Sequence, residues 1–299
     1  MTPLPSGVLV PVTTPFDGST GEVALASLAV NARTLLDNGV DGLLATGSTG
    51  EAPLLSVEES RRIVSALREV VPADRHLMVG TGGESTRATV AACQAAGEEG
   101  ADSVLVRAPA YFAPAIGAKA LLDHFRAVAD ASPVPVFIYN MPRYTHVSIT
   151  DTMLEALASH PGIVGAKDSS GDSANFAAYR RAVPHWTLLV GSGALLYAGL
   201  EMGGAGGIVA VENFAAELAV QVARAFVDGN RAEARRVQEQ LEPLHRIVVG
   251  GFGPAGVKAA MACRGLIGGP VRAPLTDLDP AGMQVVRNAL GVAELLDGS

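Results

Sequence analysis

The sequence lacks the features that would suit it to nucleic acid or to a membrane. Its formal net charge is −8 and its pI is about 5.3, so it has no basic surface of the kind that binds nucleic acid. It has no polybasic run that would bind an anionic lipid surface. No uninterrupted apolar run reaches the ~18 residues that would span a bilayer, and the first 20 residues show no signal-peptide pattern. We therefore expect a cytoplasmic protein with no nucleic-acid or membrane partner.

Cysteine is scarce, and histidine occurs without metal-site spacing. Cys93 and Cys263 both lie in alanine-rich helical stretches, which predicts buried small side chains in a reducing compartment and no disulfide framework. The six histidines form no HxH or HxxxH pair, and the sequence has no CxxC. Because metal sites commonly use such spacings, we expect no metal site.

Lysine is the scarcest charged residue type. Only Lys119, Lys167 and Lys258 are lysines, whereas 19 of the 22 basic residues are arginines. Lysine, unlike arginine, can lose its proton when it is buried and can then attack a carbonyl carbon. Lys119 lies in a helical pattern and is expected on the surface. Lys167 follows the apolar run at 163–166 directly, so it is predicted to end a buried strand and is a candidate nucleophile.

Short apolar runs alternate with amphipathic helical stretches along the chain. Eight runs occur, at 8–12, 42–46, 77–81, 103–107, 134–139, 163–166, 187–191 and 207–211, and helical stretches between them include 24–38, 56–70, 85–99, 118–131 and 215–228. The runs are apolar throughout, which is typical of parallel strands covered on both faces. Eight successive units predict an α/β fold, a (β/α)₈ TIM barrel. The alternative is an open doubly wound sheet, which the absence of a GxGxxG after the first strand disfavours.

The chain continues beyond the eighth unit. Helical stretches are predicted at 231–248, 255–263 and 280–290, and no linker or low-complexity segment precedes them. We expect a single domain with the barrel over 1–228 and a C-terminal helical extension over 229–299, which either covers one side of the barrel or builds an interface.

Polar residues gather where the predicted strands end, which is where active sites of such barrels lie. The second strand leads into GSTGE at 47–51, the fifth ends at Tyr139, the sixth at Lys167 and the seventh at Gly191. GSTGE either holds an anion with its backbone N–H groups or is a tight capped turn. Tyr139 is either a proton relay or a lining aromatic.

Taken together, these groups favour imine chemistry. A buried amine that condenses with a ketone forms an imine, and the protonated imine withdraws electrons from a neighbouring C–C or C–H bond. Backbone N–H groups would hold the carboxylate of a 2-oxo acid, and a phenol would move the proton. The pattern predicts a class I aldolase or lyase with no metal and no bound cofactor.

Five motifs in this order resemble one known family. They are GVLVPVTTPF at 7–16, GSTGE at 47–51, YNMP at 139–142, GAKDSSGD at 165–172 and GGAGGIVAVEN at 203–213. The chain is similar to the dihydrodipicolinate synthase/N-acetylneuraminate lyase family of pyruvate-dependent class I aldolases over residues 7 to about 290. The resemblance implies pyruvate and a small aldehyde or hydroxy-oxo acid as substrates, and a homotetramer built as a dimer of dimers.

The resemblance also implies roles for individual residues. Lys167 matches the Schiff-base lysine and Tyr139 the tyrosine that shuttles the proton. Ser48 and Thr49, after Gly47, match the pair whose backbone N–H groups hold the pyruvate carboxylate. Tyr111 matches a tyrosine lent to the neighbouring subunit, where it joins a hydroxyl relay with Ser48 and Tyr139. Further substrate-binding residues that we expect are Ser169, Gly191, Ile208, Tyr144 and Arg143.

The substrate assignment depends on departures from the synthase pattern. Synthases that use aspartate semialdehyde carry an arginine five residues after the strand-five tyrosine, and here that position is Tyr144, with Arg143 one residue earlier. They also often carry two tyrosines where this chain has Ala110 and Tyr111. If the segment is extended, Arg143 points away from the side that Tyr144 occupies, although a loop bulge could bring it back and Arg107 could also supply charge.

Other stretches look more like 4-hydroxy-2-oxoglutarate aldolase. They are GGESTRATV at 82–90, SHPGIVGAKDSSGD at 159–172, FGPAGVKAAM at 252–261 and GGPVRAPL at 268–275. We therefore rank cleavage or formation of 4-hydroxy-2-oxoglutarate or a related hydroxy-oxo acid first, and 4-hydroxy-tetrahydrodipicolinate (dihydrodipicolinate) synthase second. A catalytically idle pyruvate or metabolite sensor is the alternative from another functional class.

Overall fold

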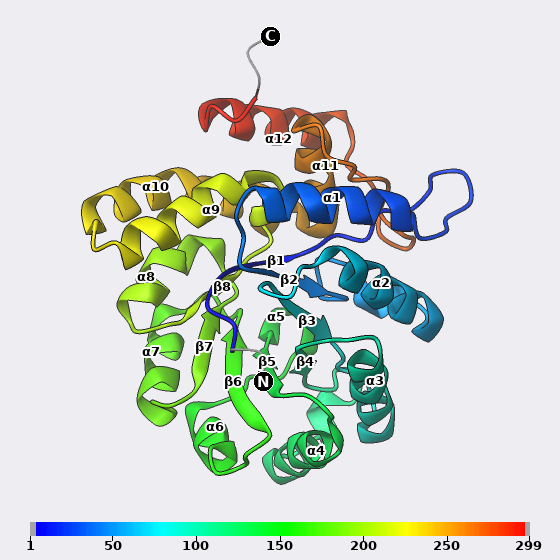
Figure 1. The fold of residues 1–299 in the computed structure, drawn as a ribbon, viewed down its shortest axis with the longest axis vertical. Helices are drawn as coiled ribbons and strands as arrows, with labels where there is room; N and C mark the ends of the chain where they lie inside the picture. Colours follow the sequence, from blue (N-terminus) through cyan, green and yellow to red (C-terminus); the bar gives the residue numbers. More distant parts are fainter. Residues whose placement is uncertain (1–3, 297–299) are drawn as a thin grey trace.

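A computed structural model describes residues 4–296 and shows a closed barrel of eight parallel strands (Figure 1). The strands are β1 (Gly7–Pro11), β2 (Gly42–Ala45), β3 (His76–Gly80), β4 (Ser103–Arg107), β5 (Val136–Asn140), β6 (Ile163–Asp168), β7 (Thr187–Val190) and β8 (Gly206–Ile208). Each strand pairs with its neighbours in sequence, and β8 closes the barrel on β1. The predicted (β/α)₈ fold is confirmed, and the closure excludes the open doubly wound sheet.

Helices surround the barrel (Figure 1). They are α1 (Leu25–Asp37), α2 (Val57–Val70), α3 (Thr86–Glu98), α4 (Ala118–Ala131), α6 (Asp151–Leu157), α7 (Ser173–Ala182), α8 (Leu196–Glu201) and α9 (Glu212–Val227). Local signals set their ends. At the start of α2, the Ser56 hydroxyl accepts from the Glu59 N–H at 3.1 Å, and the Glu59 carboxylate accepts from the Ser56 N–H at 2.8 Å. This reciprocal cap satisfies two backbone donors that the helix itself cannot pair.

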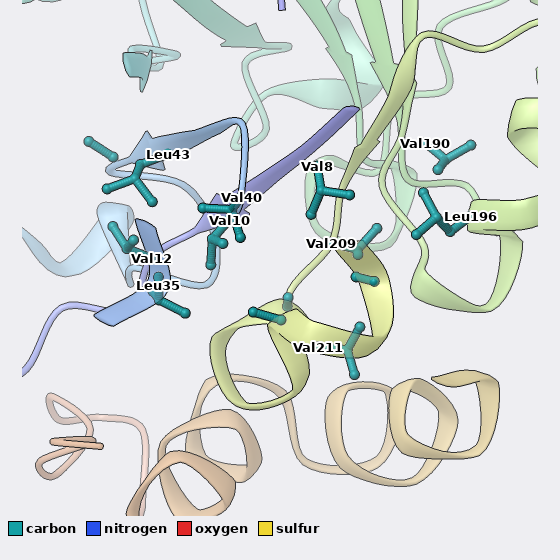
Figure 2. Packing of buried hydrophobic residues seen from close by; sticks show 14 of the residues in the cluster. Val8, Val10, Val12, Leu35, Val40, Leu43, Val190, Leu196, Val209 and Val211 are labelled. Carbon is teal, nitrogen blue, oxygen red and sulfur yellow. The ribbon is translucent and has the colours of Figure 1, made fainter. Parts of the chain in front are cut away.

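The strands bury side chains on both faces, which explains why their sequences are apolar throughout. Inside the barrel one cluster contains Leu9, Leu44, Met78, Leu105, Phe137, Tyr139, Leu189 and Ile208. The alternate residues, such as Val8, Val10 and Leu43, belong to a second cluster between the strands and the helices, seen close by in Figure 2. Each fully buried Val or Leu contributes roughly 1.5–3 kcal/mol of hydrophobic stabilisation. The inside of the barrel is therefore a packed core.

The C-terminal extension packs on one side of the barrel (Figure 1). It contains α10 (Arg231–Leu244), a π-helical turn η4 (His245–Gly250), α11 (Gly251–Cys263) and α12 (Pro280–Val292). Helix α10 packs against α9, and α11 contacts both α9 and α12. Leu241, Val257 and Val286 are fully buried in the same cluster that covers the outside of the strands. This shared core supports our proposal of one domain, in which the extension packs on the barrel; of the proposed range 229–299, residues 297–299 lie outside the described residues.

The helices predicted in the extension are present. The chain stays helical from Arg231 through Gly250, and its last six residues form the π-helical turn η4. The next helix is interrupted by a kink at Gly253, where φ is 57°, and continues regularly from Pro254, close to the predicted start at 255. Hydrophobic periodicity does not distinguish a single π turn from the α-helices on either side of it.

No helix within residues 4–296 is long and apolar enough to cross a membrane.

Candidate active site

Lys167 and Tyr139 lie side by side at the C-terminal end of the barrel. They are register partners on the paired strands β6 and β5, and residues that share register on parallel strands point to the same face of the sheet. The Lys167 Nζ atom lies 4.7 Å from the centre of the Tyr139 ring. Both residues are buried, with 4% of Lys167 and 6% of Tyr139 exposed. The structure thus brings the predicted amine and phenol together.

A cavity of about 230 Å³ opens beside this pair. The predicted site residues that line it are Ser48, Thr49, Tyr139, Arg143, Tyr144, Lys167, Ser169, Gly191 and Ile208. Gly47 lines an adjoining cavity of about 430 Å³, together with Ser48 and Tyr139. Of the described lysines, Lys167 alone lines the first cavity. The residues chosen from the strand ends therefore converge on one place.

Ser48 and Thr49 of the GSTGE loop line this cavity. The loop is closed by bonds from the Gly50 N–H to the Gly47 carbonyl and from the Glu51 N–H to the Ser48 carbonyl, each at 3.1 Å. A Cβ at Gly50 would lie 2.9 Å from the Val12 carbonyl oxygen, so the loop needs glycine there to approach the chain just after β1. In the part of the chain that the structure describes, the N–H groups of Ser48 and Thr49 donate to no protein acceptor. These two donors remain available to an anion.

Asp168 fixes the loop that follows Lys167. It is 5% exposed, and its carboxylate accepts from the Asn140 amide and the Ser170 hydroxyl at 2.8 Å each, and from the Asn175 amide at 3.1 Å. Gly191 packs against the same loop, because a Cβ at this position would collide with the Ser169 hydroxyl. The sequence prediction assigned no role to Asp168, although it stands directly after the candidate nucleophile Lys167.

The chain is similar to known proteins over most of its length. Residues 4–292 match the model of the dihydrodipicolinate synthetase family. The chain belongs to that family. It is 38% identical over 273 residues to an uncharacterized DapA-like lyase of Halobacterium salinarum, which covers 91% of this chain and 89% of the relative. It is 35% identical to a 4-hydroxy-tetrahydrodipicolinate synthase of a Synechococcus strain, over 97% of this chain and 96% of the relative.

Solved structures of the dihydrodipicolinate synthase family have the same fold. A prophage protein of the family from E. coli K12, solved in complex with pyruvate, superposes with a TM-score of 0.92 at 30% identity, covering 97% of this chain and 99% of that one. The enzyme from Cyanidioschyzon merolae, solved with lysine bound, gives a TM-score of 0.92 at 31% identity, with 97% and 99% covered. This chain is a lyase of the same family.

The expectation that Arg143 points away from the side that Tyr144 occupies is wrong. The segment after β5 is not extended but forms a helical turn, α5 (Pro142–Thr145), with Pro142 at its first position. Successive residues on a helix point about 100° apart, not 180° apart as on a strand, so Arg143 and Tyr144 both line the cavity. The Arg143 guanidinium donates to the Gly250 carbonyl at 3.4 Å. Arg107, the other candidate for positive charge, instead forms an ion pair with Glu84 at 2.9 Å.

Tyr111 is not among the residues that line the cavity. It is 80% exposed, and its ring packs edge-on against Phe112, which is 66% exposed, with 4.9 Å between the ring centres. Its backbone N–H donates to the Glu84 carboxylate at 2.9 Å. A role for Tyr111 in catalysis therefore stays a proposal that involves a second subunit.

Further polar residues near the site were assigned no role from the sequence. Ser192 and His245 line the cavity, and Ser192 Oγ lies 3.1 Å from His245 Nε2. Burial, with a smaller effect of Arg246, lowers the pKa of the His245 ring to about 4. Glu212 is fully buried after β8, and burial raises the pKa of its carboxyl well above the ordinary value. Glu51, the last residue of GSTGE, forms an ion pair with Lys258, the third lysine of the chain.

That third lysine, Lys258, is buried but is paired. Its Nζ lies 2.6 Å from the Glu51 carboxylate and donates to the Pro270 carbonyl at 2.7 Å. It also lies 4.5 Å from the centre of the Phe16 ring. The pair joins the GSTGE loop to the C-terminal extension. Lys119 is exposed and forms an ion pair with Asp123 one helical turn along, as expected of a surface lysine.

Within residues 4–296, no group of three or more His, Cys, Asp or Glu side chains is placed to hold a metal ion.

Proposed function

We propose that this chain is a Schiff-base lyase that makes or cleaves the C–C bond between pyruvate and an aldehyde, with 4-hydroxy-2-oxoglutarate or a related hydroxy-oxo acid as substrate. One observation carries the proposal. A buried lysine, Lys167, shares a single cavity with a phenol, Tyr139, and with the unpaired backbone donors of Ser48 and Thr49. An amine, a proton carrier and an anion site are what imine chemistry on a 2-oxo acid needs.

In the cleavage direction, the Lys167 amine attacks C2 of the 2-oxo acid and water leaves, which forms an imine. Tyr139 accepts the proton of the C4 hydroxyl and passes its own proton to the Ser48 hydroxyl as the C3–C4 bond breaks, and the electron pair of that bond moves into the protonated imine. The aldehyde departs. The remaining enamine takes a proton at C3, and hydrolysis releases pyruvate and the free amine. Because the imine itself is the electron sink, the reaction proceeds without a bound cofactor.

Ser48 and Thr49 hold the 2-oxo acid in position. Their N–H groups donate to its carboxylate, which places the carbonyl carbon against the amine. Gly191 and Ile208 line the wall of the same cavity, and Ser169 adds a hydroxyl. The Ser48 hydroxyl passes the proton between Tyr139 and a Tyr111 supplied by another subunit.

A homotetramer built as a dimer of dimers completes this arrangement. The exposed rings of Tyr111 and Phe112 support it, because adjacent exposed aromatics are typical of interfaces between subunits.

The synthase reaction is the second candidate. Arg143 lines the cavity, and a guanidinium is well suited to the carboxylate of a second substrate such as aspartate semialdehyde. Relatives that carry the synthase name also support it. The aldolase stays first because four stretches at 82–90, 159–172, 252–261 and 268–275 resemble 4-hydroxy-2-oxoglutarate aldolase.

A comparison of two activities tests the ranking. We would measure kcat/KM for cleavage of 4-hydroxy-2-oxoglutarate, by pyruvate release, and for condensation of pyruvate with aspartate semialdehyde. A larger value for the cleavage supports the aldolase, and an equal or larger value for the condensation makes the chain a synthase. Turnover of neither substrate, with pyruvate still binding, would indicate the idle sensor.

A further inference from the structure

The loop after β7 carries a hydroxyl that the proposed mechanism does not use. Ser192 lines the cavity beside Gly191, and His245 reaches it from η4 in the C-terminal extension. The two residues are 53 positions apart in the sequence. Single π turns of this kind occur frequently at functional sites, and η4 also contributes Val249 and Gly250 to the cavity wall.

The hydrogen bonds around His245 fix the direction of its bond to Ser192. The Gly193 N–H donates to His245 Nδ1 at 3.2 Å, so Nδ1 is an acceptor and carries no proton. A neutral imidazole then has its proton on Nε2, and Nε2–H donates to Ser192 Oγ at 3.1 Å. The ring is neutral near pH 7 because burial lowers the pKa of His245 to about 4.

This arrangement leaves the Ser192 hydroxyl hydrogen free to donate. Its oxygen already accepts from His245, and among the described residues no protein acceptor receives its proton. A hydroxyl that accepts one hydrogen bond and faces a cavity is ready to donate to an acceptor on a ligand.

The extension holds this loop rigidly. The Gln238 amide donates to the Gly193 carbonyl at 2.9 Å, and the Tyr197 N–H donates to the Gln238 amide oxygen at 3.0 Å. A Cβ at Gly193 would lie 2.8 Å from Val211 and 3.2 Å from His245 Nδ1, so glycine lets the ring approach. Both backbone polar groups of Gly193 are therefore bound by residues of the extension.

Ser192 lies at a different part of the rim from the proposed carboxylate site. The GSTGE loop follows β2, which is three strands away from β7 around the closed barrel, whereas Lys167 lies on β6, next to β7. A 2-oxo acid with its carboxylate at GSTGE and its C2 bonded to Lys167 has its remaining carbons free to extend toward β7. Arg143 lines the same cavity and adds positive charge.

We propose that Ser192, oriented by His245, donates a hydrogen bond to an anionic group at the substrate end remote from the imine, and so selects hydroxy-oxo acids with a second carboxylate. Ser192 is thus a specificity-determining residue, and His245 is a positioning residue that acts through it. This inference rests on the proposed function of Lys167.

Two substrates of equal length test it. 4-Hydroxy-2-oxoglutarate ends in a carboxylate, and 4-hydroxy-2-oxopentanoate has a methyl group at that place. The readout is the specificity ratio, which is kcat/KM for the first divided by kcat/KM for the second. Ser192→Ala should lower this ratio about tenfold or more, since a hydrogen bond to a charged group is lost. Ser192→Thr keeps the hydroxyl and should retain most of the ratio.

The His245→Asn variant tests whether His245 orients Ser192 or only supports the fold. The asparagine oxygen can still accept from the Gly193 N–H, but no donor reaches Ser192. The ratio should fall, and the double variant Ser192→Ala/His245→Asn should lose no more than Ser192→Ala alone, because both changes remove one interaction. His124→Asn is the matched control, since His124 is a buried histidine that contacts Thr86 on the outside of the barrel. Its ratio should equal that of the wild type.

A binding measurement keeps this inference distinct from the proposed function. 2-Oxoglutarate and 2-oxopentanoate differ in the same way and lack the hydroxyl needed for cleavage, so each can be trapped on Lys167 with borohydride. Trapping on the wild-type protein should reach half of its maximum at a lower concentration of 2-oxoglutarate than of 2-oxopentanoate. Ser192→Ala should reduce this difference. If both acids are trapped but Ser192→Ala changes neither preference nor specificity ratio, the role of Ser192 is wrong while the lyase stands. If wild type traps pyruvate but neither five-carbon acid, this inference is wrong while the lyase stands. If it traps neither these acids nor pyruvate, the proposed function fails and this inference fails with it.

Discussion

Lys167 and Tyr139 face the same cavity from adjacent strands, with the lysine nitrogen 4.7 Å from the centre of the phenol ring. Strand register fixes this relationship, because the two residues are direct partners in the β5–β6 ladder. A rigid barrel therefore sets the distance between the proposed nucleophile and the proposed proton carrier. Sites built on strands hold such distances more tightly than sites built on loops.

The Tyr139→Phe variant should show whether Tyr139 takes part in catalysis or only packs in the barrel. The change keeps the ring, which belongs to the buried cluster inside the barrel, and removes only the hydroxyl. We expect kcat to fall roughly 100-fold or more, as is typical when a positioned acid–base group is lost, while the melting temperature changes little. A variant with nearly full kcat would show that the tyrosine only packs.

Lys258→Met should destabilise the fold. The change leaves the Glu51 carboxylate, which has 0% of its side chain exposed, without its cation. Removing one partner of a buried ion pair costs about 3–5 kcal/mol of the free energy of unfolding. The double variant Glu51→Gln/Lys258→Met removes both charges and should recover part of that loss. Urea unfolding of the three proteins measures these differences, and a loss below about 1 kcal/mol, as for surface pairs, would mean that the pair contributes little.

Glu212→Gln should change how stability depends on pH. Burial raises the pKa of the Glu212 carboxyl well above its ordinary value of 4.5, so the folded state keeps a proton that the unfolded chain releases. The stability tied to this proton is present below the unfolded pKa and is lost as pH rises toward the folded one. Glutamine does not titrate, so the variant should gain stability relative to wild type between pH 5 and pH 8. If the free energies of unfolding of the two proteins differ by the same amount at pH 5 and at pH 8, this prediction is wrong.

The sequence was sufficient to predict the barrel and the central pair. Parallel strands buried on both faces leave continuous apolar runs, and Tyr139 and Lys167 stand at or near the ends of two of them. Their placement in one cavity then follows from barrel geometry, in which all strand ends of one polarity meet at one rim.

Other parts of the site depend on contacts that the sequence pattern does not reveal. Arg143 was misplaced because the conformation of one short turn decides where it points, although Pro142 is a residue type favoured at the first position of a helix. His245 reaches Ser192 only because the extension folds back over the barrel rim. Lys258 was noted for its rarity, but its partner Glu51 is more than 200 residues away along the chain.

Borohydride reduction in the presence of pyruvate tests the central claim most directly. The protein has three lysines, of which Lys119 is exposed and Lys258 is paired with Glu51. Mass spectrometry of the reduced protein should show one three-carbon adduct, and peptide mapping should place it on Lys167. Lys167→Arg should abolish the adduct, because arginine keeps its proton. An adduct on Lys119 or Lys258, or no adduct at all, would contradict the imine mechanism.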